Sequence, residues 1–258
     1  MEKEQQILFL LKSYLVTKQK GTPWKEYVFS MFCKIQYKEN KVLHYEKTDF
    51  LYRTLEFELI KIDFNTNNKD LDKSIEFLHR TFYRYDGLQL NITPISMVIE
   101  NKVSLLDQWK RIRSSLQADY KGIFADDYII RINSVMESPE VYNMPVNNYF
   151  YYGLMFLGTP HETSAGWNRS QQVVLSDFDD TIFEENMKHE MNIDDKRCFS
   201  IMGKTFNESS DCQVNKFYGR TQIPVGSIFP DWTQLEVDYT KGDFNVYWKY
   251  ELIKQEEE

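Results

Sequence analysis

The sequence predicts an α+β fold, with antiparallel β-sheet regions at the N- and C-terminal ends packed with a central block of about three helices. Three observations support this. Apolar and charged residues alternate between residues 51 and 64, helical spacing dominates residues 102–157, and the chain ends in a hairpin pattern. We expect a β-rich region with one or two helices at 1–100, a helical block at 101–158 and a second β-rich region at 159–258. Whether these form one compact domain is left open.

The N-terminal region carries one helical pattern followed by strand patterns. Residues 3–17 place five apolar residues on one helical face, namely Ile7, Leu8, Leu11, Tyr14 and Leu15. A strand beginning at Leu8 is the competing interpretation. Residues rich in β-formers then predict strands at 27–37, 42–47 and 51–64. The last of these alternates apolar residues with glutamates, which is typical of a sheet with one solvated face.

Helical patterns fill the middle of the chain. The spacing predicts a helix over 71–84 capped by Asp70. Residues 86–96 are loop-like, and a short strand is predicted at 95–99. Further helices are predicted over 102–119, 125–137 and 145–157. The last segment is apolar nearly all round, which predicts the central buried helix.

The C-terminal third returns to strand patterns. Strands are predicted at 172–176, 197–206 and 214–218. The clearest pattern comes last, where apolar residues alternate on both sides of the turn residues 240–243. A glycine in that turn, Gly242, predicts a β-hairpin.

Composition excludes several classes of protein. The 258 residues carry a net charge of −8, which disfavours nucleic acid binding through a broad basic face. Three distant cysteines and no basic, apolar leader indicate a reducing compartment, so we expect a cytoplasmic protein with no membrane association. The Lys-, Asn- and Tyr-rich, Ala-poor composition is typical of an AT-rich genome. We expect a protein of bacterial or phage origin.

One stretch suggests chemistry. Asp177-Phe178-Asp179-Asp180-Thr181 follows the apolar run 173–176. It resembles the first motif of the haloacid dehalogenase-like phosphohydrolases, a hydrophobic strand followed by D-x-D-x-T. The resemblance implies that Asp177 is the nucleophile, that Asp179 is the general acid/base and that both bind Mg²⁺, with Thr181 and Lys204 in support. A Mg²⁺-dependent phosphohydrolase is therefore the alternative function.

The surroundings of the motif favour a different interpretation. The enzyme requires a doubly wound parallel sheet, with Leu175 on a central strand. Only 77 residues follow Thr181, and they end in an antiparallel hairpin. We therefore expect a strand that ends in an acidic turn, with Asp179 or Asp180 capping the segment 181–190. Neither a catalytic residue, a metal nor a cofactor is favoured.

Aromatic residues provide the remaining functional signal. Tyr149, Tyr151, Tyr152, Trp167 and Trp232 are candidates for a protein interface, because Tyr and Trp are enriched in interface hot spots. A role in an aromatic core is the alternative. We expect a non-catalytic protein that binds another protein, of the adaptor, chaperone or toxin-neutralising type. A component of a bacterial secretion or conflict system is one candidate partner. The oligomeric state is left open.

Overall fold

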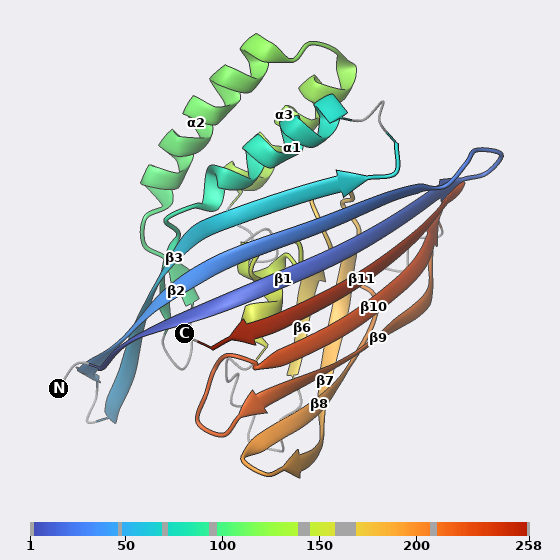
Figure 1. Ribbon diagram of the computed structural model, residues 1–258. Coiled ribbons are helices and arrows are strands. Elements are labelled where there is room, and N and C mark those ends of the chain that lie inside the picture. Colours follow the sequence, from blue (N-terminus) through green and yellow to red (C-terminus); the bar gives the residue numbers. More distant parts are fainter. Residues whose placement is uncertain are drawn as a thin grey trace.

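The chain forms one antiparallel sheet of eleven strands, in the order β5-β4-β3-β2-β1-β11-β10-β9-β8-β7-β6 (Figure 1). The computed structural model describes residues 3–45, 48–68, 72–92, 97–138, 145–157, 169–206 and 211–256. The strands are β1 (Lys3–Gln19), β2 (Lys25–Tyr45), β3 (Thr48–Thr66), β4 (Gln89–Ile92), β5 (Met97–Ile99), β6 (Arg169–Val174), β7 (Ile182–Ile193), β8 (Lys196–Thr205), β9 (Cys212–Pro224), β10 (Trp232–Lys241) and β11 (Phe244–Gln255).

The predicted α+β arrangement with a central helical block is wrong. Both predicted β regions belong to a single sheet, because β1 pairs with β11 along twelve residue pairs from Leu8↔Gln255 to Gln19↔Phe244. The first and last strands thereby lie side by side in the middle of the sheet. The helices pack beside this sheet and do not separate two sheet regions (Figure 1).

The helix predicted over residues 3–17 is also wrong, since this segment is strand β1. Its inward face is apolar with a period of two, at Phe9, Leu11 and Leu15, which are at most 5% exposed. Its outward face carries further apolar side chains, including Leu8 and Leu10. Apolar residues on both faces produce helix-like spacings by coincidence, so the competing strand interpretation holds.

Three predicted helices are confirmed as α1 (Asp72–Phe82), α2 (Lys102–Asp119) and α3 (Ile123–Glu137). The predicted cap Asp70 lies outside the described residues. All three helices gather on one side of the sheet, beyond β3 (Figure 1). In the part of the chain that the structure describes, no helix is long and apolar enough to cross a membrane.

The predicted central helix over 145–157 forms two short 3₁₀ segments, η4 (Pro145–Asn147) and η5 (Gly153–Phe156). The segment is buried as predicted, but a turn at Asn148 interrupts it. The Asn148 Oδ1 accepts a hydrogen bond from the Phe150 backbone N–H at 2.9 Å, which competes with helical bonding. We call residues 145–157 the plug, because they fill the concave side of the sheet.

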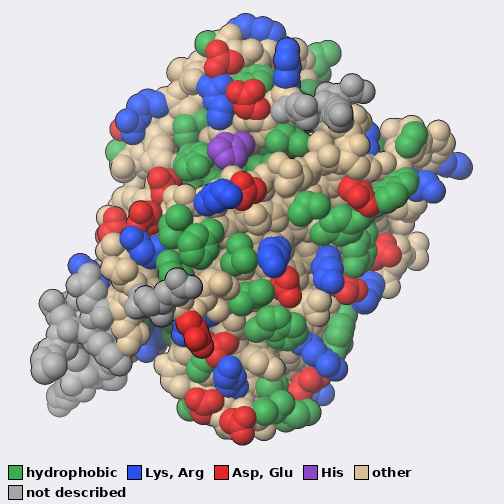
Figure 2. All heavy atoms as spheres, viewed as in Figure 1, with side chains coloured by type: hydrophobic (Ala, Val, Ile, Leu, Met, Phe, Trp, Pro, Cys, Tyr) green, Lys and Arg blue, Asp and Glu red, His purple; other side chains and the backbone are tan. Residues whose placement is uncertain are grey.

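The plug and the sheet share an aromatic core. Phe150 packs against Phe29 and Phe82, with ring centroids 4.7 and 4.8 Å apart, and Phe57 packs against Tyr152 at 4.4 Å. The other face of the long strands is open to solvent, where apolar side chains alternate with charged ones (Figure 2). The fold therefore has a filled inner face and a mixed outer face.

Candidate functional site

The carboxylate of Asp177 lies inside the protein, where four side chains hydrogen-bond it. Its Oδ2 accepts bonds from the Arg84 guanidinium at 2.5 Å, from Tyr151 and from Tyr128 at 3.4 Å. Its Oδ1 accepts a bond from the Asn148 amide at 3.1 Å. The side chain is 4% exposed. Asp177 therefore joins η2 (Tyr83–Tyr85), helix α3, the plug and the segment after β6.

Arg84 balances this buried charge. Its side chain is fully buried, and its guanidinium carbon lies 4.5 and 4.7 Å from the ring centroids of Tyr85 and Tyr151. Burial opposes its charge, but the carboxylate of Asp177 outweighs that effect and holds the pKa of Arg84 well above its usual value. Burial also raises the pKa of Tyr151. The cluster is therefore an ion pair surrounded by neutral phenols.

Asp179 has a separate set of partners. Its Oδ1 accepts bonds from the Thr181 backbone N–H at 2.9 Å, from the Thr181 hydroxyl at 2.7 Å and from the Lys241 ammonium at 2.7 Å. Its Oδ2 accepts a bond from Tyr239 at 2.6 Å. Burial opposes ionisation, but the bonds from Lys241, Thr181 and Tyr239 lower the pKa of Asp179. Lys241 also bonds Asp180 at 2.5 Å, so it ties the acidic turn to the β10–β11 hairpin.

The geometry does not give the constellation that the phosphohydrolase resemblance implies. The strand before the motif, β6, is the edge strand of an antiparallel sheet, whereas the family places it in a parallel sheet. Asp177 and Asp179 bond to different partners, and Lys204 lies on β8 with its ammonium 3.2 Å from Glu184. Only Asp179 and Thr181 contact each other, in the local turn that the competing interpretation predicts.

A chamber of about 540 Å³ lies next to this turn. Its floor is apolar and includes Leu15, Phe178, Val246 and Trp248, and the Phe178 and Trp248 rings stack at 14° with centroids 6.3 Å apart. Its rim is charged, with Asp179, Asp180, Asp211 and Asp243 beside Lys241 and Arg131. A concave apolar site with a few polar groups at its edge is the usual form of a binding site.

Two further hollows continue the chamber. One of about 620 Å³ shares Thr17, Gln19 and Phe244 with it and extends to Trp24 at the β1–β2 turn. Another of about 570 Å³ shares four residues with it on the opposite side and extends along α3 to Glu137; these are Arg131, Ser176, Asp179 and Asp180. We call the three together the tip groove, because it crosses the ends of the hairpins β1–β2 and β10–β11.

Most residues of this site could not be identified from the sequence. Arg84 pairs with Asp177 across 93 positions, and Lys241 pairs with Asp179 across 62. Neither basic residue stands in a motif. The available signal for Lys241 was its place in the turn of the predicted hairpin. That prediction does not indicate that Lys241 contacts the acidic turn.

The predicted interface residues lie in different places. Tyr149, Tyr151 and Tyr152 are at most 1% exposed and belong to the plug, so the core interpretation holds for them. Trp167 lies outside the described residues. Trp232 is partly exposed and faces outward from β10, because its neighbour Thr233 faces inward and is fully buried.

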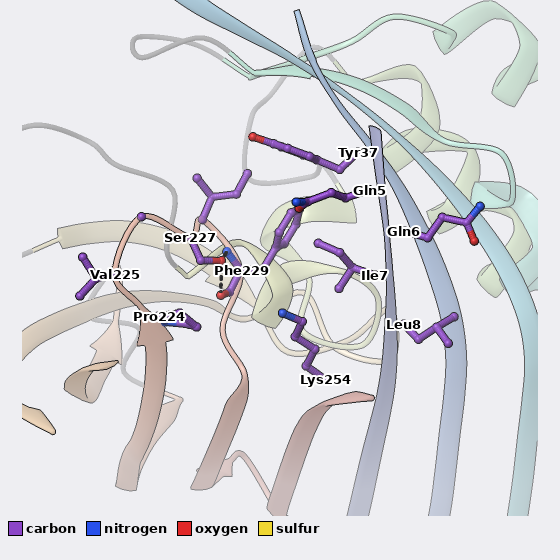
Figure 3. A pocket seen from close by; sticks show the side chains of 12 residues that line it. Gln5, Gln6, Ile7, Leu8, Tyr37, Pro224, Val225, Ser227, Phe229 and Lys254 are labelled. Carbon is purple, nitrogen blue, oxygen red and sulfur yellow. Dashed lines mark hydrogen bonds between the residues drawn. The ribbon is translucent and has the colours of Figure 1, made fainter. Parts of the chain in front are cut away.

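A second cavity lies at the other end of the sheet (Figure 3). It encloses about 1040 Å³ between the start of β1 and the loop after Pro224. Gln5, Ile7 and Lys254 point into it, and the loop is closed by hydrogen bonds between Ser227 and Phe229 of 2.9 and 3.0 Å. The Lys254 ammonium lies 3.7 Å from Asp231, which also pairs with Lys196 at 2.8 Å. The polar groups at this cavity do not converge on one point.

Among the described residues, no group of three or more His, Cys, Asp or Glu side chains is placed to hold a metal ion. The two carboxylates of the suggested Mg²⁺ site, Asp177 and Asp179, already accept hydrogen bonds at both oxygens. The arrangement is therefore suited to holding the turn in place and to presenting charge at the groove.

No protein-family model matches the chain, and no curated protein matches it. Among solved structures, a chain of lipovitellin, solved for its lipid–protein interactions, matches with a TM-score of 0.40 and 7% identity. The match covers 97% of this chain and 25% of that one. An AttH protein from Nitrosomonas europaea matches with a TM-score of 0.15 and 7% identity, covering 97% and 50%. The chain thus spans a quarter of the length of the lipovitellin chain, and scores this low carry no argument about function.

Proposed function

We propose that this protein is a non-catalytic binding protein, and that the tip groove receives an extended, basic segment of another protein. The observation that carries the proposal is the groove itself. Three hollows adjoin one another through shared lining residues, and the central chamber has an apolar floor and a mostly acidic rim. A globular ligand fits such a path less well than a chain does.

The floor offers the apolar contacts that a bound segment needs. Phe244 is 45% exposed and Trp24 is 52% exposed, and both line the part of the groove near the β1–β2 turn. Large aromatic side chains dominate interface energetics when a partner covers them. Both residues are therefore available as anchors for an apolar side chain of the segment.

The rim favours a basic segment. The groove is lined by six carboxylates and three basic side chains, which are Glu137, Asp177, Asp179, Asp180, Asp211 and Asp243 against Lys25, Arg131 and Lys241. Arg84 balances the buried Asp177, which leaves five carboxylates against three bases. Such an imbalance steers cationic partners and disfavours acidic ones.

The titratable groups near the groove support binding over catalysis. A nucleophile or general base needs a free, suitably oriented lone pair within reach of a substrate. Asp177 is enclosed by Arg84 and tyrosines, and Asp179 is held by Lys241, Thr181 and Tyr239. Asp180, whose side chain is 81% exposed, is a carboxylate that a partner can reach.

Selection of random twelve-residue peptides by phage display on the intact protein tests the proposal. We expect selected peptides to combine basic residues with at least one large apolar residue. Their affinity, measured by isothermal titration calorimetry, should fall at least tenfold in Phe244→Asp. It should also fall as salt rises, because the rim attraction is screened.

Phe206→Asp is the matched control, because Phe206 is 42% exposed at the end of β8 and lines no part of the groove. It should leave peptide affinity within twofold of wild type. Selection of acidic peptides, or equal losses in the two variants, would contradict the proposal.

A further inference from the structure

A row of apolar side chains crosses the outer face of the sheet. Trp232 pairs with Ile253, Ile253 with Leu10, and Leu10 with Phe32, so four adjacent strands contribute one residue each. All four face away from the core, because the residues next to them along each strand face inward and are fully buried; these are Thr233, Leu252, Leu11 and Met31. The row is partly exposed.

Strands in a sheet lie about 4.8 Å apart, so the row from Trp232 to Phe32 is about 14 Å long. Outward apolar residues at matching positions of four strands are unusual, because the solvated face of an antiparallel sheet is normally polar. The four residues therefore form a continuous apolar row across the middle of the outer face.

One outward pair next to the row carries opposite charges on the two central strands, β1 and β11. Two residues beyond Leu10 and Ile253 along these strands, Lys12 of β1 pairs with Glu251 of β11. The next outward pair along the same two strands is Tyr14 with Lys249, followed by Val16 with Tyr247. The boundary between β1 and β11 thus separates a basic residue from an acidic one at the same level.

We propose that this face binds a second copy of the chain, with a two-fold axis that runs along the strands between β1 and β11. This rotation keeps each level along the strands and exchanges β1 with β11 and β2 with β10. Leu10 then lies over Ile253 of the second copy, and Phe32 lies over its Trp232. Lys12 lies over Glu251 of the second copy, and Glu251 over its Lys12.

The rotation places each of these cross-strand pairs over the same pair of the second copy, and the paired side chains are complementary. The apolar row covers itself, the charged level forms two ion pairs across the axis, and Tyr14 lies over Lys249 of the second copy, where a cation can approach the ring face. Sheets that pack face to face lie about 10 Å apart with their strands nearly aligned, which this axis allows. A two-fold contact is also the commonest form of self-association.

Sedimentation velocity of the full chain tests the inference. The chain has a mass of 31.0 kDa, and we expect wild type to sediment as a species of twice that mass at concentrations of tens of micromolar. Phe32→Glu should yield monomer, because it buries an unpaired charge in the row. Lys12→Glu and Glu251→Lys should each weaken the dimer at least tenfold, because each places like charges across the axis.

Mixing the two charge variants provides the decisive measurement. One chain then carries two acidic residues and the other two basic residues at this level, so we expect a heterodimer of near wild-type affinity. This result does not depend on whether either variant is slightly less stable. Lys110→Glu, on the exposed part of α2, is the control and should remain dimeric.

Circular dichroism of each variant verifies that it is folded. A wild type that stays monomeric at 100 µM, charge variants as dimeric as wild type, or a mixture that forms no heterodimer would each overturn the inference.

Discussion

Replacement of Asp177 by asparagine separates a structural role of the acidic turn from a catalytic one. The change keeps the shape of the side chain and removes its charge. The fully buried Arg84 then loses the negative charge that balances its guanidinium, while its bond to the Thr81 carbonyl at 3.0 Å remains. Removing one member of a buried ion pair costs about 3–5 kcal/mol, because the other charge stays desolvated. We expect Asp177→Asn to lower the free energy of unfolding by that amount.

Urea unfolding followed by far-ultraviolet circular dichroism measures this free energy. Arg84→Met should destabilise similarly, and the double variant should be less destabilised than the sum of the two by at least about 2 kcal/mol, because it leaves no unpaired charge. Asp180→Asn is the control, since that side chain is 81% exposed and exposed pairs contribute about 0–1 kcal/mol. A stability of Asp177→Asn within about 1 kcal/mol of wild type would refute this account of the turn.

Three further changes test other parts of the fold. Burial raises the pKa of Glu185 from 4.5 to about 8, so the folded state holds a proton that the unfolded chain releases. Stability should therefore fall as the pH rises from about 4.5 to about 8, by about 1.4 kcal/mol per unit, and Glu185→Gln should remove that slope in urea titrations at several pH values; an unchanged slope would contradict it. Gly219→Ala should cost about 1–3 kcal/mol in the same assay, because the added Cβ would lie 2.6 Å from the Gln234 carbonyl oxygen, and a neutral result would show that β9 can shift. Phe150→Ala should cost about 3–5 kcal/mol, whereas a loss below 1 kcal/mol would mean that the plug contributes little to the core.

Elements with strong local patterns could be predicted from the sequence. Helices α1, α2 and α3 and the hairpin β10–β11 were predicted near their observed bounds, because their apolar residues recur with one period only. Strand β7 was missed because Glu185 occupies an inward, fully buried position between Phe183 and Met187. An acidic residue there breaks the alternation that identifies a strand.

The arrangement of the sheet could not be predicted, because it depends on pairings between distant segments. The contact between β1 and β11 joins the two ends of the chain, and no local pattern encodes it. The same limit applies to the site. Asp177 and Asp179 were identified as the notable residues, but their roles depend on Arg84 and Lys241, which only the folded chain brings near.

The two aspartates of the turn explain how the tip groove keeps its shape. Asp177 fixes the turn to the plug and the helices, and Asp179 fixes it to the β10–β11 hairpin. Arg131 of helix α3 also holds the turn, since it donates to the Asp177 carbonyl at 3.1 Å, and it lines the groove. A site held in this way loses little conformational entropy when a ligand binds, which favours affinity. A motif that resembles a catalytic pair is thus better suited to preorganising a binding surface than to reacting with what binds there.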